Sequence, residues 1–131
     1  MLEVHVIKEE ALVVGRPKGI LNGELALEMC EFIEVKEVEM ESGFNRYCDM
    51  GGLYRIDLSL DEIEYIAKRR REYNPNEVRV KSAFLATNFL AEAIVGLYRL
   101  LLRSSRIEVQ SFTSVQDAAQ WLGVEPRKLA L

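Results

Sequence analysis

Segments patterned like β-strands alternate with segments patterned like helices along nearly the whole of the 131-residue chain. The expected order is β-β-α-β-α-β-α-β-α, and strands that alternate with helices form mostly parallel sheets with right-handed crossovers. The expected strands are residues 2–6, 11–14, 44–50, 77–86 and 106–112. The sequence therefore predicts an α/β fold with a mostly parallel sheet of about five strands, an N-terminal hairpin and four helices.

Polar residues that can cap a helix precede each expected helix. A side-chain oxygen at such a position accepts a hydrogen bond from a backbone N–H of the first turn. Ser59 is followed three residues later by Glu62, which is the spacing of a capping box. The second helix is expected to stop at residues 74–76, Asn-Pro-Asn, and the fourth at Gly123. The candidate caps are Asn22, Ser59, Thr87 or Asn88, and Ser114.

The bulk composition indicates one domain, residues 1–131, with a loose tail after Pro126. A formal net charge of −4 argues against binding to nucleic acid or to an anionic membrane surface. The N-terminus has neither the basic start nor the apolar run of a secretory signal. The only two cysteines, Cys30 and Cys48, lack metal-ligand spacing, which favours a reducing, cytoplasmic location.

Residues 82–102 are rich in Ala, Leu, Ile and Val, like a membrane span. Asn88, Glu92, Gly96 and Arg99 interrupt the segment, and its first part alternates like a strand. A strand followed by a buried helix explains this pattern better than a spanning helix of about 20 apolar residues. We therefore predict no membrane insertion. Gly96 inside the helix would be tolerated if another backbone approached it closely.

Polar residues gather where the expected strands end. Asp49, Asp57, Ser59, Thr87 and Asn88 all lie at or near the carboxyl ends of strands. In open α/β sheets, ligands and partners bind at that edge. The Ser59 hydroxyl would lie at a helix N-terminus, where backbone N–H groups favour an anion. Two interpretations stay open: a passive helix cap, and a switch that gains and loses a phosphate.

Four local patterns support a resemblance to a known family. They lie at residues 45–49, at 56–59, at 81–87, and at 107–109 leading to 118–122. In their order and spacing they resemble the STAS domain, the fold of anti-sigma factor antagonists and of sulfate-transporter tails. More closely, the chain resembles the SpoIIAA-like branch of small bacterial proteins. The resemblance implies this α/β fold and a non-catalytic role in protein interaction.

In the anti-sigma factor antagonists, a partner kinase phosphorylates the second serine of an Asp-Ser-Ser-Gly-Leu loop. Residues 57–61, Asp-Leu-Ser-Leu-Asp, would occupy that loop, so the resemblance implies that Ser59 is at the phosphoacceptor position. Leu58 and Leu60 replace the neighbouring serine and the glycine. Asp61 places a carboxylate near the hydroxyl, and this charge would repel a phosphate.

The first functional hypothesis is a non-catalytic protein-interaction module. Its partner would be a regulator or a kinase-like protein, bound at the loop before the second helix and at that helix. The site residues predicted on this hypothesis are Ser59, Asp57, Asp61 and Asp49. We also consider a homodimer, because small domains with an edge hairpin often self-associate.

The alternative hypothesis is a binder of a small apolar or lipid-like compound. It is motivated by the apolar helix at residues 89–102, with Phe84 and Trp121 near it in sequence. The same apolar stripe is also typical of core packing, so a cavity in the structure would distinguish the two interpretations.

Catalysis is the least supported class of function. His5 is the only histidine and lies in an expected strand. No histidine is near Cys48 in sequence to take the proton from its thiol and leave a thiolate. Asp49, Asp57 and Asp61 would have to converge to hold Mg²⁺. We therefore predict no catalytic residues, no metal site and no cofactor.

Overall fold

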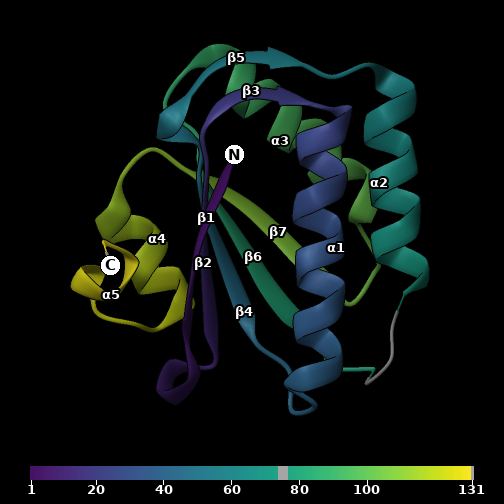
Figure 1. The fold of residues 1–131 in the computed structure, drawn as a ribbon. Helices are drawn as coiled ribbons and strands as arrows, with labels where there is room; N and C mark the ends of the chain where they lie inside the picture. The colour runs from purple at the N-terminus through teal and green to yellow at the C-terminus, as the bar shows by residue number, and fades with distance from the viewer. Residues whose placement is uncertain (74–76, 131) are drawn as a thin grey trace.

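The computed structural model describes residues 1–73 and 77–130, and its centre is a five-stranded sheet (Figure 1). β1 and β2 form an antiparallel hairpin, whereas β2, β4, β6 and β7 pair in parallel. The predicted sheet, mostly parallel with an N-terminal hairpin, is therefore confirmed, and its overall character is mixed. In spatial order the strands are β1 (Leu2–Ile7), β2 (Leu12–Pro17), β4 (Asn45–Asp49), β6 (Val80–Leu85) and β7 (Ile107–Phe112).

Helices cover both faces of this main sheet (Figure 1). One face carries α1 (Gly23–Glu39), α2 (Leu60–Glu72) and α3 (Phe89–Leu102), and the other carries α4 (Val115–Leu122) and α5 (Pro126–Leu129). The predicted caps Asn22, Ser59 and Ser114 are confirmed, because each side chain accepts a hydrogen bond from the first turn. Asn88, rather than Thr87, caps α3, and its Oδ1 lies 2.9 Å from the Ala91 nitrogen.

The sequence does not predict two short strands, β3 (Gly19–Asn22) and β5 (Leu53–Asp57). They pair in parallel with each other as a separate two-stranded sheet, and they lead into α1 and α2 respectively. Most of their residues are half-buried or exposed, and neither strand shows an apolar alternation. No periodic signal therefore marks them, and only the pairing of two distant segments makes them strands.

The end of the chain differs from the loose tail that we expected after Pro126. Residues 126–129 form α5, and the Leu129 side chain is buried. The Arg16 side chain donates a hydrogen bond to the Leu129 carbonyl oxygen, which ties this segment to β2. The buried leucine, this hydrogen bond and an ion pair between Lys128 and Glu9 at 3.8 Å thus hold a segment whose composition alone indicates no structure.

Helix ends follow the sequence only in part. Gly123, in the left-handed region with φ of 75°, ends α4 as predicted. The predicted stop of α2 at residues 74–76 lies outside the described residues, and α2 itself ends at Glu72. In the described part of the chain, no backbone approaches Gly96 closely, because Gly96 is exposed and a Cβ there would meet no atom within 4 Å.

The two faces of the main sheet pack differently. α4 lies close to β6 because Ala83, Ala118 and Ala119 are small and fully buried between them. On the opposite face, larger side chains such as Leu25 and Val95 pack against the strands. These side chains do not fill all of the space between the helices and the sheet, and a cavity remains there.

Residues 82–102 divide into the end of β6 and all of α3, as the sequence predicts. Within the part of the chain that the structure describes, no helix combines the length and apolar character needed to cross a bilayer.

Candidate functional site

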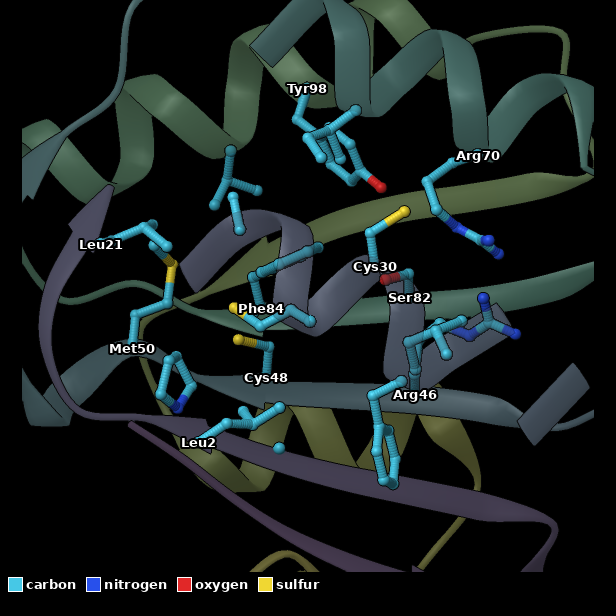
Figure 2. A pocket seen from close by; sticks show the side chains of 18 of the residues that line it. Leu2, Leu21, Cys30, Arg46, Cys48, Met50, Arg70, Ser82, Phe84 and Tyr98 are labelled. Carbon is cyan, nitrogen blue, oxygen red and sulfur yellow. The ribbon is translucent and has the colours of Figure 1, made fainter. Parts of the chain in front are cut away.

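A cavity of about 160 Å³ lies between the main sheet and helices α1, α2 and α3 (Figure 2). Alternate residues of the strands point into it, among them Gly15 of β2, Cys48 of β4 and Phe84 of β6. Cys30 of α1 and Tyr98 of α3 close it from the helical side. Cys48 and Phe84 are only half-buried although helices cover their strands, because the cavity leaves one side of each without a neighbour.

Gly15 contributes to the cavity by lacking a side chain. A Cβ at this position would have its nearest neighbours, Leu2 Cδ1 and the Tyr47 carbonyl oxygen, 4.0 Å away. Those are ordinary van der Waals distances, so the backbone here leaves room that a larger residue would fill.

Buried charges lie beside one end of the cavity. Glu37 of α1 is buried and is shared by three arginines from three other parts of the fold. Its carboxylate accepts hydrogen bonds from Arg70 Nη2 at 2.7 Å and from Arg106 Nη2 at 2.8 Å. Arg46 Nη2 lies 3.6 Å from the same carboxylate. Arg46 and Arg70 also line the cavity, and Figure 2 shows both at the end away from Met50 and Leu21.

This charge cluster, which we define as Glu37 with Arg46, Arg70 and Arg106, has more donors than acceptors. Among the residues that the structure describes, Arg46 Nε, Arg70 Nη1 and Arg106 Nε are buried and have no hydrogen-bond partner. Burial lowers the pKa of Arg46 to about 10, with Arg70 and Arg106 adding to the effect and Glu37 opposing it. Buried donors without acceptors are costly, so these three nitrogens are a strained feature of the cluster.

The cavity is also lined by two thiols and a phenol, from Cys30, Cys48 and Tyr98. Burial raises the pKa of the Cys30 thiol to about 11, and burial together with the charge of Asp49 raises that of Cys48 to about 12. Burial likewise raises the pKa of Tyr98 to about 12, and its hydroxyl points toward Cys30 and Arg70 (Figure 2). Protonated thiols are poor nucleophiles, so neither cysteine is activated for nucleophilic attack.

Ser59 forms the capping box that its spacing predicts. Its Oγ accepts a hydrogen bond from the Glu62 N–H at 3.1 Å, and Glu62 Oε1 accepts one from the Ser59 N–H at 2.9 Å. Glu62 also fits closely against α1, because a Cβ on Gly23 would lie 1.9 Å from Glu62 Oε2. The Ser59 hydroxyl is exposed and caps α2. A serine that is also phosphorylated would have the same capping geometry before it gains the phosphate.

The predicted carboxylates have separate positions. Asp49 ends β4, where its Oδ1 accepts a hydrogen bond from the Gly51 N–H at 2.8 Å and its Oδ2 lies 3.9 Å from Arg16 Nε. Asp57 ends β5 opposite Asn22, and Asp61 is exposed in the first turn of α2. Within the described ranges, no three His, Cys, Asp or Glu residues form a group that could hold a metal ion.

The residues proposed for apolar binding are divided between the two faces of the sheet. Phe84 lines the cavity together with Val95 and Tyr98 of α3. Trp121 lies on the opposite face, where its ring centroid is 5.5 Å from that of Phe112. Phe84 and part of α3 therefore lie at the cavity, and Trp121 does not.

The sequence interpretation missed the charge cluster. One signal was available: Arg70 follows Ile63 and Ala67 at helical spacing, and these three are the buried residues of α2. Residues 68–71 form a basic run near the end of the helix, and Arg70 is the arginine of this run that lies on the apolar stripe.

No protein-family model and no curated protein matches the chain. Among solved structures, the chain is similar to an uncharacterised protein of the DUF3478 family with a SpoIIAA-like fold, from Shewanella loihica PV-4. The two share 16% sequence identity, the match covers 93% of this chain and 92% of the other, and the TM-score is 0.61. At this identity the similarity establishes the fold alone. The chain has a SpoIIAA-like fold, in agreement with the resemblance carried by its sequence patterns.

Proposed function

We propose that this protein is a non-catalytic module that binds a small, largely apolar compound between its main sheet and helices α1 to α3. The observation that carries the proposal is the cavity of about 160 Å³. A protein cavity of about 150 Å³ lined by apolar side chains is large enough to bind benzene. Ligand pockets are typically apolar with a few placed polar groups, which describes a lining that includes Phe84, Cys48 and Tyr98.

Hexan-1-ol is a suitable neutral probe because its carbon chain is about as large as benzene. We expect saturable binding in a titration followed by two-dimensional NMR, with the largest shift changes at Gly15, Cys48, Phe84 and Tyr98. Shift changes spread over the exposed surface, or none at all, would contradict the proposal.

A Gly15→Leu variant should abolish this binding by filling the cavity. Gly15 lies in a strand with ordinary backbone angles, so a side chain there needs no strained conformation. We expect the affinity for hexan-1-ol to fall at least about tenfold, while the free energy of unfolding stays equal or rises, since glycine weakens a strand.

The matched control is Gly96→Leu, the same substitution at an exposed position of α3 that faces open space. It should leave the affinity for hexan-1-ol unchanged. If Gly15→Leu binds the probe as tightly as Gly96→Leu does, the probe occupies another place and the cavity is not the site.

A second candidate function is binding of a protein partner at the start of α2, with Ser59 as a regulated position. The supporting observation is that Asp57, Ser59 and Asp61 are exposed beside two large exposed side chains. Leu60 and Tyr65 are each 56% exposed, and exposed apolar groups of this size are often found at interaction surfaces. We propose a regulator or a kinase-like protein as the partner.

Substitutions of Ser59 distinguish a residue that only caps α2 from a residue that is switched by phosphorylation. Ser59→Ala should lower the free energy of unfolding by about 0.5–2 kcal/mol through loss of the cap, whereas Ser59→Asp and Ser59→Asn keep a capping side chain. On the switch hypothesis, intact-mass analysis of the native protein should show a phosphate that Ser59→Ala lacks. Ser59→Asp should also capture partners differently from Ser59→Asn, which lacks the charge. Identical partners for all variants, with no phosphate, would leave Ser59 as a cap only.

We also infer a cytoplasmic location, which the two free thiols of Cys30 and Cys48 support. A homodimer through β1 is a further proposal, because β1 is an edge strand of the main sheet.

A further inference from the structure

We propose that the compound in the cavity carries a carboxylate, and that this group binds beside Arg46 and Arg70 at one end of the cavity. The inference rests on the proposed binding function and adds the chemical class of the ligand. A small aliphatic or aromatic monocarboxylate fits the arrangement.

The first argument is the position of the two arginines. Arg46 comes from β4 and Arg70 from α2, and both side chains line the cavity (Figure 2). They are 8% and 3% exposed, so bulk water does not satisfy their donors. Arg46 Nε and Arg70 Nη1 have no hydrogen-bond partner among the described residues. A guanidinium group binds a carboxylate through short, charge-assisted hydrogen bonds, which would supply the acceptors.

The second argument is the balance of charge. Three guanidinium groups share the single Glu37 carboxylate, so the cluster carries more positive than negative charge. A buried charge is tolerated when it is paired. An arriving carboxylate would bring the cluster closer to neutrality, and its own desolvation cost would be offset by the same pairing.

The third argument concerns direction. Three charged residues line the cavity: Arg46, Arg70 and Glu62. Glu62 and Arg70 are both on α2, and eight residues of helix separate them by about 12 Å. A carboxylate is therefore attracted at the arginine end and repelled at the Glu62 end. The apolar part of the ligand would extend past Phe84 and Cys48 toward Met50 (Figure 2).

The test uses three compounds that share a six-carbon chain: hexanoate, hexan-1-ol and hexylamine. Titrations of the wild-type protein at fixed ionic strength should give an affinity for hexanoate at least about tenfold above that for hexan-1-ol, and hexylamine should bind most weakly. Benzoate in the same titration shows whether an aromatic acid fits better than an aliphatic one. This comparison needs no substitution, so it does not depend on whether a variant folds.

Arg70→Met then removes one of the two charges while keeping an unbranched side chain. We expect the affinity for hexanoate to fall at least about tenfold, and to fall more than the affinity for hexan-1-ol does. Lys68→Met is the matched control, because it removes the same charge from an exposed position of the same helix and should change neither affinity.

The outcomes separate the two proposals. Equal affinities for hexanoate and hexan-1-ol overturn the carboxylate inference but support the apolar cavity as a binding site. A preference for hexylamine also overturns the inference. No binding of any of the compounds overturns the proposed function as well.

Discussion

Replacing Glu37 by glutamine is expected to lower the free energy of unfolding by about 3–5 kcal/mol. The Glu37 carboxylate is buried and lies within 4 Å of Arg46, Arg70 and Arg106. Glutamine has almost the same shape but no charge, so three buried guanidinium groups would lose the anion that they share. Removing one partner of a buried ion pair is costly because the other charge remains in a medium that solvates it poorly.

Urea unfolding of the two proteins measures this loss directly. Glu39→Gln is the matched control: Glu39 is two residues further along α1, exposed, and paired with Lys36 at 2.8 Å. An exposed ion pair on a helix contributes little, so this variant should change the free energy of unfolding by less than about 1 kcal/mol. If the two variants lose equal stability, the charge cluster does not hold the helical layer to the sheet.

Leu102→Ala is expected to cost about 2–5 kcal/mol of stability, through lost burial and through the void that remains. Leu102 is the last residue of α3 and is 1% exposed within the core between α3 and the strands. Side chains in a protein core have little freedom to move into the space of missing atoms, so part of the void would remain.

Leu100→Ala provides the comparison, because it makes the same change two residues earlier in the same helix, where the leucine is 53% exposed. The expected loss is within about 0.5 kcal/mol. Thermal or urea unfolding of both variants checks the pair. Similar losses at the two positions would show that the packing of α3 on the sheet differs from that described here.

The pair Leu100 and Leu102 also shows where sequence patterns stop being informative. Both lie in one apolar run, and composition gives them equal weight. The position of α3 against β7 decides that one is core and the other is surface. Trp121 is a similar case: it is near α3 in sequence, but the chain crosses to the other face of the sheet before reaching it.

Less of the candidate site than of the fold could be predicted from the sequence. Ser59 and its capping box follow from a spacing of three residues, and the structure confirms them. The cavity and the charge cluster join Glu37, Arg46, Arg70 and Phe84, which come from four separate elements. No local sequence pattern encodes the distances between these four side chains. The alternation of residues along β4 places Arg46 on one face of the sheet, but this becomes informative only once it is known that helices cover that face.

The sequence by itself determined the order of the main elements, the parallel character of the sheet, and the caps at Asn22, Ser59 and Ser114. These depend on apolar periodicity and on hydrogen bonds between residues three or four positions apart, which neighbouring residues specify. Only the tertiary structure decided the pairing of β3 with β5, the burial of Glu37 among arginines, and the open space at Gly15. Each of these features depends on how segments that are distant in the sequence pack together. That packing is a property of the whole fold.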